Sequence, residues 1–195
     1  MAMSLTELEK SLKNLRLSGM VATLQARALQ VASHEMDFIE AFGWLVQDEL
    51  DRRRSTLLNR RYRASGLTER KYLKDIDWGY NPKLPKRECL ELGALKFIDA
   101  KEDILLVGQP GTAKSHIAKA LALLAVERGY RVIYRDANDF IGGILEAREI
   151  GNWRKHRADL VAADLLVIDD LFLRRLPQGA GDELGYLEMP SQEHP

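Results

Sequence analysis

The chain has 195 residues, 46% hydrophobic and 30% charged, a balance typical of a soluble globular protein with one domain and an appendage, or two small domains. Its 29 basic and 29 acidic residues cancel, so no global field draws nucleic acid or a membrane, and no apolar stretch approaches the roughly 20 residues of a membrane span. The single cysteine, Cys89, excludes a disulfide framework, and acidic residues near the N-terminus argue against a signal peptide; we expect a cytoplasmic protein.

The first part of the chain is predicted to be a small all-α domain. Residues 4–31 carry leucines at helical spacing after a candidate capping box, Ser4-x-x-Glu7. A break is expected at Ser18-Gly19, with a second helix after it. Another helix is predicted to begin at Asp37, because an apolar stripe with helical spacing follows that residue.

The composition turns basic between residues 52 and 74, where Glu69 is the single acidic residue. The positive charge surrounds the expected helix, so we interpret it as a candidate nucleic-acid surface. The alternative is a solvated helix whose arginines extend along apolar neighbours. The arginines expected to contact DNA are Arg52, Arg53, Arg54, Arg60, Arg61 and Arg63. Residues 1–74 are thus the predicted DNA- or partner-binding region.

Residues 75–98 are predicted to be a linker followed by a lead-in helix. Two prolines and a glycine interrupt residues 75–88, whereas Leu90 to Ile98 has helical spacing. The aromatic residues Trp78 and Tyr80 could stack on a base or cover an adenine. Alternatively, they pin the linker against its domain.

From Asp103 onward, short apolar runs alternate with helical patterns. The expected strands are 104–107, 131–134 and 165–168, and the expected helices are 115–128, 136–150 and 153–162. Gly142-Gly143 is a candidate weak point in the middle helix. This alternation predicts βαβ units, a parallel sheet and therefore the α/β class.

The stretch Gly108-Gln109-Pro110-Gly111-Thr112-Ala113-Lys114-Ser115 lies between an expected strand and an expected helix. This arrangement is typical of a phosphate-binding P-loop, in which backbone N–H groups and the helix N-terminus face an anion. Lys114 is expected to reach the β- and γ-phosphates of a nucleotide, and the Ser115 hydroxyl to bind Mg²⁺. The predicted nucleotide-binding residues are Gly108, Gln109, Pro110, Gly111, Thr112, Ala113, Lys114, Ser115 and His116.

One position departs from the motif, because Ala113 stands where G-x-x-x-x-G-K-[ST] has glycine. Its methyl group restricts the backbone, so weaker binding is the default expectation. Similar Gly-Thr-Ala-Lys-Ser loops occur in some ATPases of the AAA+ superfamily. We therefore expect nucleotide binding to survive.

The last expected strand ends in Asp169-Asp170, which places two carboxylates at the carboxyl edge of the sheet. Asp169 is predicted to bind Mg²⁺ together with Ser115. Asp170 is predicted to orient or deprotonate an attacking water, and with Lys114 it completes the predicted catalytic residues. The P-loop and the acidic strand in this order predict an ATP site better than either motif alone.

Several stretches together resemble the IstB-type ATP-binding proteins, helper ATPases of insertion-sequence transposition that are related to the DnaC helicase loader. They are Leu15–Met20, the Asp75-Ile76-Asp77-Trp78 arm, Gly108–Ser115, Arg128–Val132, the Asp169-Asp170 strand, and Leu176-Pro177 with Gly179-Ala180. The resemblance implies a P-loop NTPase core of the AAA+ type over residues 99–184, with helices on both faces of the sheet. It also implies ATP and Mg²⁺ as cofactors, DNA and a transposase subunit as partners, and self-assembly as in full-length relatives.

Residues 185–195 depart from the family pattern, in which a further strand would lie between the P-loop strand and the acidic strand. Without that strand, Ile104–Val107 and Leu165–Ile168 would lack their shared neighbour, and the sheet would be incomplete. We expect a chain truncated in this way to be marginally stable and a poor ATPase. A DnaC-like helicase loader and an inactive remnant acting as an interaction module through residues 1–74 are the alternative functions.

Overall fold

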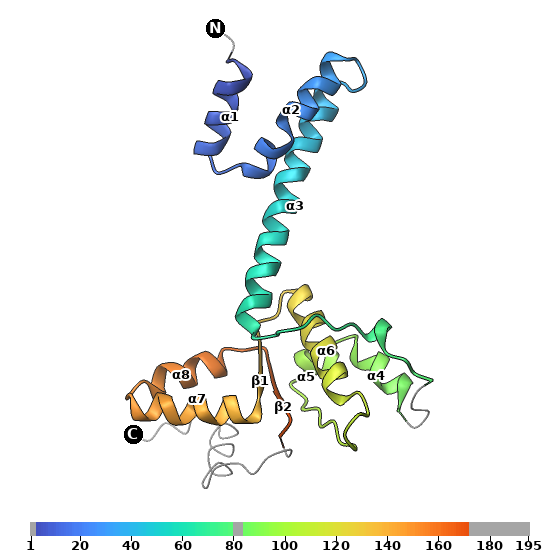
Figure 1. The fold of residues 1–195 in the computed structure, drawn as a ribbon, viewed down its shortest axis with the longest axis vertical. Coiled ribbons are helices and arrows are strands. Elements are labelled where there is room, and N and C mark those ends of the chain that lie inside the picture. Colours follow the sequence, from blue (N-terminus) through green and yellow to red (C-terminus); the bar gives the residue numbers. More distant parts are fainter. Residues whose placement is uncertain (1–2, 80–83, 172–195) are drawn as a thin grey trace. The chain divides into compact units, whose positions relative to one another are not determined.

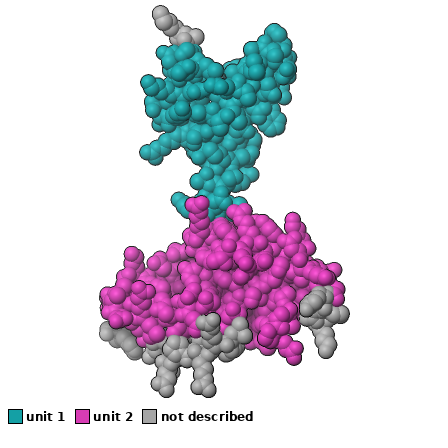
Figure 2. Space-filling view, viewed as in Figure 1, with its two compact units in different colours: residues 1–60 teal, residues 61–195 magenta. Residues whose placement is uncertain are grey.

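The computed structural model describes residues 3–79 and 84–171 (Figure 1). The chain divides into two units, residues 1–60 and residues 61–195, which Figure 2 colours separately. Within the described residues, no helix combines the length and the apolar character that a membrane crossing needs. Tyr80, the family motifs after residue 171 and the predicted tail at 185–195 lie outside the described residues.

The regular elements described in unit 1 are all helices, as predicted. It contains α1 (Leu5–Asn14), α2 (Ser18–Ala32) and most of α3 (Phe38–Ser65), which continues past the unit boundary. The predicted capping box at Ser4 is confirmed: Ser4 Oγ accepts from the Glu7 N–H at 3.3 Å, and Glu7 Oε2 accepts from the Ser4 N–H at 2.8 Å. The predicted start of α3 is also confirmed, since Asp37 Oδ1 accepts from the Glu40 N–H at 2.8 Å.

The break between α1 and α2 lies earlier than predicted. Arg16 adopts a left-handed conformation with φ 60°, and the Leu17 N–H donates to Leu12 O at 2.9 Å, which closes the end of α1. Gly19 therefore lies inside α2. There the Gly19 N–H donates to Glu49 Oε2 of α3 at 2.6 Å, and a Cβ at Gly19 would meet Glu49 Cα at 2.7 Å. Gly19 is thus a contact point between two helices, which is why it does not end one.

Unit 2 contains a pair of parallel strands with helices on both sides. The elements are η1 (Leu73–Asp75), α4 (Lys86–Leu92), α5 (Lys96–Ala100), α6 (Lys114–Arg128), β1 (Val132–Asp136), α7 (Ala137–Glu149), α8 (Trp153–Val161) and β2 (Leu165–Asp169). The register of the pair runs from Val132 opposite Leu165 to Asp136 opposite Asp169. Figure 1 shows α6 on one side of the strands and α7 with α8 on the other. The predicted α/β class and the parallel sheet are confirmed.

The alternation of side chains along β1 and β2 explains how one face of the strand pair is covered by α7 and α8. Ile133 of β1 and Leu166 and Ile168 of β2 pack against the buried cluster of α7 and α8, whose members are Phe140, Ile141, Ile144 and Leu160. The predicted weak point at Gly142-Gly143 does not interrupt α7. Ile141 and Ile144, which flank it, are fully buried, so tertiary packing outweighs the low helix propensity of two glycines.

The prediction of a strand at 104–107 is wrong. These residues form no strand, and Leu105 and Val107 are 75% and 82% exposed although both are apolar. In the described part of the chain, only β1 and β2 form a ladder. A strand needs a neighbour to accept and donate its backbone hydrogen bonds, and no described strand lies beside this segment.

Candidate nucleotide-binding site

The glycine-containing loop at residues 108–113 turns tightly into the start of α6. Thr112 Oγ1 donates to Gln109 O at 2.8 Å, and the Thr112 hydroxyl lies so close to Gly108 that a Cβ there would stand 2.9 Å from it. Helix α6 begins at Lys114. Since the first turn of a helix leaves N–H groups without intrahelical acceptors, the loop and the helix start present donors to one region of space.

Ala113 shows why the motif has glycine at this position. It precedes the first residue of α6 and adopts a left-handed conformation, with φ 62° and ψ 13°. A residue with a Cβ adopts this conformation at a cost of about 1–2 kcal/mol, which glycine avoids. Residue 113 therefore has a conformation that glycine would adopt without strain, and with alanine the loop carries local backbone strain.

The Lys114 side chain folds back onto its own loop. Its Nζ donates to Gln109 O at 2.9 Å, so the ammonium group lies over the turn made by residues 109–112. A single carbonyl is a weak partner for an ammonium compared with an anionic oxygen. The lysine is therefore placed to exchange that carbonyl for a phosphate.

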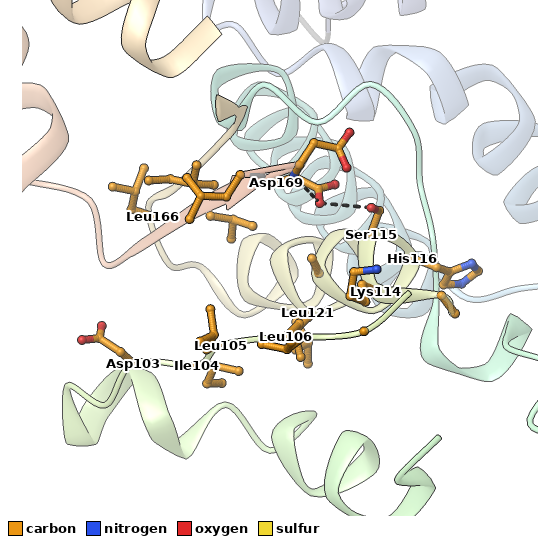
Figure 3. A pocket seen from close by; sticks show the side chains of 18 of the residues that line it. Asp103, Ile104, Leu105, Leu106, Lys114, Ser115, His116, Leu121, Leu166 and Asp169 are labelled. Atoms are coloured by element: carbon orange, nitrogen blue, oxygen red, sulfur yellow. Dashed lines mark hydrogen bonds between the residues drawn. The ribbon is translucent and has the colours of Figure 1, made fainter. Parts of the chain in front are cut away.

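The start of α6 and the end of β2 meet at Ser115 and Asp169. Ser115 Oγ donates to Asp169 Oδ1 at 3.0 Å, across 54 positions in the sequence (Figure 3). Asp170, the neighbouring carboxylate, is exposed, adopts a left-handed conformation with φ 55°, and donates its N–H to Asp169 Oδ1 at 2.9 Å. The structure thus brings the metal-binding candidates together and leaves Asp170 open to solvent beside them.

Tyr134, which the sequence did not indicate, also belongs to this cluster. Its hydroxyl donates to Asp169 Oδ2, and its ring is buried in β1. Burial, followed by the hydrogen bond to Asp169, raises the pKa of Tyr134 above its ordinary value. Strand alternation predicts the face on which Tyr134 lies, but the contact with Asp169 depends on how β1 and β2 pair.

A cavity of about 690 Å³ joins the loop, the start of α6 and β2. Its lining includes the loop residues Gly108, Pro110 and Gly111, the α6 residues Lys114 and Ser115, and Asp169-Asp170. The apolar segment 104–107 lies along one side and β2 along the other (Figure 3). A volume of this size falls in the range of small-molecule sites.

His116, one of the predicted nucleotide-binding residues, uses its side chain elsewhere. The His116 Nε2 atom lies 3.0 Å from Tyr72 O, so the ring fastens α6 to the segment that precedes the linker. Nearby, Lys119 of α6 pairs with Glu69 at 3.3 Å. His116 is nevertheless among the residues that line the cavity at the loop.

The six arginines predicted to contact DNA fall into two groups along α3. Arg52 and Arg53 pair with the buried carboxylate of Glu49 at 3.3 Å and 2.6 Å, and Arg54 lies 3.9 Å from Asp51. These contacts, led by the hydrogen bond from Arg53, lower the pKa of Glu49 to about 2. Arg60, Arg61 and Arg63 form no ion pair with any residue in the described ranges.

Comparisons with known proteins agree with these motifs. The family model described as IstB-like ATP binding protein matches residues 10–189. A protein of Mycobacterium tuberculosis named as an ATP-binding protein in an insertion sequence is 30% identical over 91% of this chain and 70% of its own length. A Pseudomonas aeruginosa protein named as an ATP-binding protein of insertion sequence IS21 is 26% identical over 96% of this chain and 66% of its own length.

A shorter match lies outside that group. The chromosomal replication initiator protein DnaA of Aquifex aeolicus is 38% identical over 44% of this chain, a stretch that covers 20% of its own length. The chain therefore spans about two thirds of the insertion-sequence relatives it matches and shares only one part with the replication initiator.

Proposed function

Because the chain belongs to the family of IstB-like ATP-binding proteins, we propose that it binds ATP with Mg²⁺ at residues 108–116 and acts as the nucleotide-dependent helper of a DNA transposition reaction. The observation that carries the proposal is the 3.0 Å contact between Ser115 Oγ and Asp169 Oδ1, because it joins the loop motif to the acidic strand. The relatives named as insertion-sequence proteins support the transposition context.

The phosphates of ATP would lie over the loop at the start of α6. Backbone N–H groups of residues 111–116 would face the phosphate oxygens, and the positive end of the helix dipole would favour their charge. Lys114 Nζ, now 2.9 Å from Gln109 O, would move onto the β- and γ-phosphates. The loop supplies both the geometry and the charge that a triphosphate needs.

The oxygen atoms of Ser115 and Asp169 are suited to Mg²⁺. A hydroxyl and a carboxylate are hard oxygen ligands, and magnesium sites on nucleotides use one or two such groups together with phosphate oxygens and water. The Ser115 hydroxyl and Asp169 Oδ1 already face each other at the mouth of the loop. Bound there, Mg²⁺ would neutralise charge on the phosphates.

Hydrolysis would use Asp170 and Lys114. The Asp170 carboxylate is exposed at the end of β2, next to Asp169, where it could accept a hydrogen bond from an attacking water. Lys114 would stabilise the charge that develops on the transferred phosphoryl group. Both roles follow from their placement around the same cavity.

DNA contact is proposed for the second group of arginines on α3. Arg60, Arg61 and Arg63 have no carboxylate partner among the described residues, so their charge remains available for phosphates. Such contacts would position the protein on DNA with little sequence preference. A transposase subunit and further copies of the chain are the proposed protein partners.

A replication-associated ATPase is the second candidate function, and the match to DnaA is the observation that favours it. That match covers under half of this chain, whereas the insertion-sequence proteins of M. tuberculosis and P. aeruginosa match 91% and 96% of it. The longer matches make transposition the preferred proposal. An inactive remnant that only binds DNA would retain affinity for DNA and show no response to ATP.

A nucleotide titration tests the proposal most directly. The fluorescent analogue mant-ATP is expected to bind the full chain in the presence of Mg²⁺, and Lys114→Ala should abolish that binding. Lys155→Ala, an exposed lysine on α8, is the matched control and should leave binding unchanged. Equal binding by the wild type and Lys114→Ala would refute the assignment of the loop. Stimulation of a co-encoded transposase by ATP would then separate transposition from replication.

A further inference from the structure

Tyr134 occupies an unusual place for a residue of a buried strand. Its ring is 8% exposed within β1, yet its hydroxyl reaches the carboxylate at the carboxyl end of the neighbouring strand. Tyr134 pairs in register with Val167, two positions before Asp169. The side chain therefore extends along the sheet toward the edge where the loop and β2 meet.

The two oxygens of the Asp169 carboxylate have different partners. Asp169 Oδ1 accepts from Ser115 Oγ at 3.0 Å and from the Asp170 N–H at 2.9 Å. Asp169 Oδ2 accepts from the Tyr134 hydroxyl. A carboxylate held through both oxygens cannot turn part of the way about its Cβ–Cγ bond without losing a hydrogen bond, so Tyr134 fixes the plane of the Asp169 carboxylate and keeps one oxygen directed at Ser115.

The backbone of Tyr134 is held by the strand pairing and by the side chain of Arg135. The strand pairing fixes its position relative to β2, and Arg135 Nη1 donates to Tyr134 O at 2.6 Å. The same Arg135 atom donates to Ser65 O at 3.2 Å. Because its backbone is fixed, the Tyr134 hydroxyl can orient the Asp169 carboxylate. The hydroxyl of a mobile surface tyrosine would move together with the carboxylate and could not orient it.

We propose that Tyr134 is a positioning residue for the metal-binding carboxylate: it holds Asp169 Oδ2 so that Oδ1 stays turned toward Ser115, where Mg²⁺ bound with ATP would be coordinated. This inference rests on the proposed nucleotide site. Residues that hydrogen-bond to a metal-binding carboxylate commonly change metal affinity by about 10–100-fold when they are removed. The predicted effect therefore falls on the contribution of magnesium to binding, and the affinity for the nucleotide alone should not change.

A second tyrosine in the same unit offers a matched control. Tyr130 also donates its hydroxyl to a carboxylate, Asp99 Oδ1 at 2.9 Å, and neither residue lines the cavity at the loop. Tyr130→Phe and Tyr134→Phe each remove one hydroxyl and keep the ring. If the Tyr134 hydroxyl only stabilised the fold, Tyr134→Phe and Tyr130→Phe would both leave the effect of Mg²⁺ on nucleotide binding unchanged.

The test measures the dissociation constant of mant-ATP with excess EDTA and with saturating Mg²⁺ for the wild-type chain and both variants, alongside thermal unfolding by circular dichroism. The ratio of the two constants defines the magnesium enhancement. Tyr134→Phe is expected to reduce this enhancement about 10-fold, with the EDTA value and the melting temperature close to those of the wild type. Tyr130→Phe is expected to preserve both constants.

Each other outcome is decisive. An enhancement in Tyr134→Phe equal to that of the wild type overturns the positioning role while leaving the nucleotide site intact. A Tyr134→Phe chain that does not fold assigns the tyrosine to the scaffold and also overturns the role. If the wild type binds no mant-ATP, or binds it without any magnesium enhancement, the proposed function itself fails at that step and the role of Tyr134 falls with it.

Discussion

The Ser115 hydroxyl lies 3.0 Å from the Asp169 carboxylate, although the two residues stand 54 positions apart and on different kinds of element. Helix α6 carries Ser115 and packs on both strands, while β2 ends at Asp169. The contact therefore depends on the packing of α6 on the strand pair, and it persists although residues 104–107 form no strand. A helix packed on one sheet face is sufficient to bring the two motifs together.

Ser115→Ala should remove the response of nucleotide binding to magnesium. The substitution deletes one of the two proposed oxygen ligands and keeps the loop backbone, so mant-ATP binding in EDTA should be preserved while the gain from added Mg²⁺ falls at least several-fold. Ser33→Ala is a suitable control, because Ser33 Oγ donates to Gln30 O at the end of α2 and Ser33 is not among the residues that line the cavity. A variant with normal magnesium dependence would remove Ser115 from the metal site.

Ala113→Gly should stabilise the chain. Ala113 has φ 62°, so glycine relieves a left-handed strain of about 1–2 kcal/mol and loses part of that gain to the greater freedom of the unfolded chain. The expected net gain in the free energy of unfolding is up to about 1 kcal/mol, with nucleotide affinity equal or higher. Denaturant unfolding followed by circular dichroism measures it.

A second alanine-to-glycine substitution serves as a control for the expected increase in the free energy of unfolding. Ala158 is an exposed residue inside α8, where alanine is favoured over glycine. Ala158→Gly should therefore destabilise the chain by about 1 kcal/mol. If both substitutions destabilise it, the left-handed conformation at residue 113 does not hold in solution.

The two groups of arginines should differ in their effect on DNA affinity. Each phosphate contact contributes about 0.9 to the slope of log K against log salt concentration, so Arg60→Ala with Arg63→Ala should make that slope shallower by about 2. Arg52→Ala with Arg53→Ala removes the two arginine partners of Glu49 and should mainly lower the melting temperature. Fluorescence anisotropy with labelled duplex DNA at several salt concentrations gives the slopes. Equal changes in both pairs would show that pairing with Glu49 does not withhold charge from DNA.

The sequence predicted local elements well and long-range contacts poorly. The helix starts at Ser4 and Asp37 have capping side chains that act within three residues, so the pattern alone locates them. The prediction of a strand at 104–107 is wrong because an apolar run alone does not make a buried strand. A neighbouring strand must also pair with it, and the apolar run does not provide one. The prediction of a break at Ser18-Gly19 is wrong because the contact that places Gly19 inside α2 is made with Glu49, 30 positions away, which a local pattern does not reveal.

The candidate site shows the same division. The motif located Lys114, Ser115 and Asp169, since each has a fixed spacing from a glycine or from the end of an apolar strand. The sequence does not predict the contact of Tyr134 with Asp169, because that contact depends on the register of β1 against β2, which no local pattern encodes. The basic stretch at 52–74 does not predict the division of the arginines, because the acidic partners Glu49 and Asp51 precede it in the sequence.

The buried carboxylate of Glu49 should make unit 1 sensitive to acid. Its pKa is lowered from 4.5 to about 2 by Arg53, Arg52 and the Gly19 N–H, so the folded state favours the ionised form more than the unfolded state does. A group whose folded pKa is depressed contributes stability above its unfolded pKa, and that contribution is lost as pH falls from about 4.5 toward 2.

Glu49→Gln should lower the melting temperature at neutral pH, because it leaves the arginines without a countercharge. It should also flatten the acid dependence of the melting temperature of the full chain between pH 5 and pH 3, as followed by helical circular dichroism. Glu35→Gln, at an exposed position before α3, is the matched carboxyl-to-amide control and should follow the wild type. A Glu49→Gln chain with the same acid dependence as the wild type would show that this carboxylate is not ionised and paired in solution.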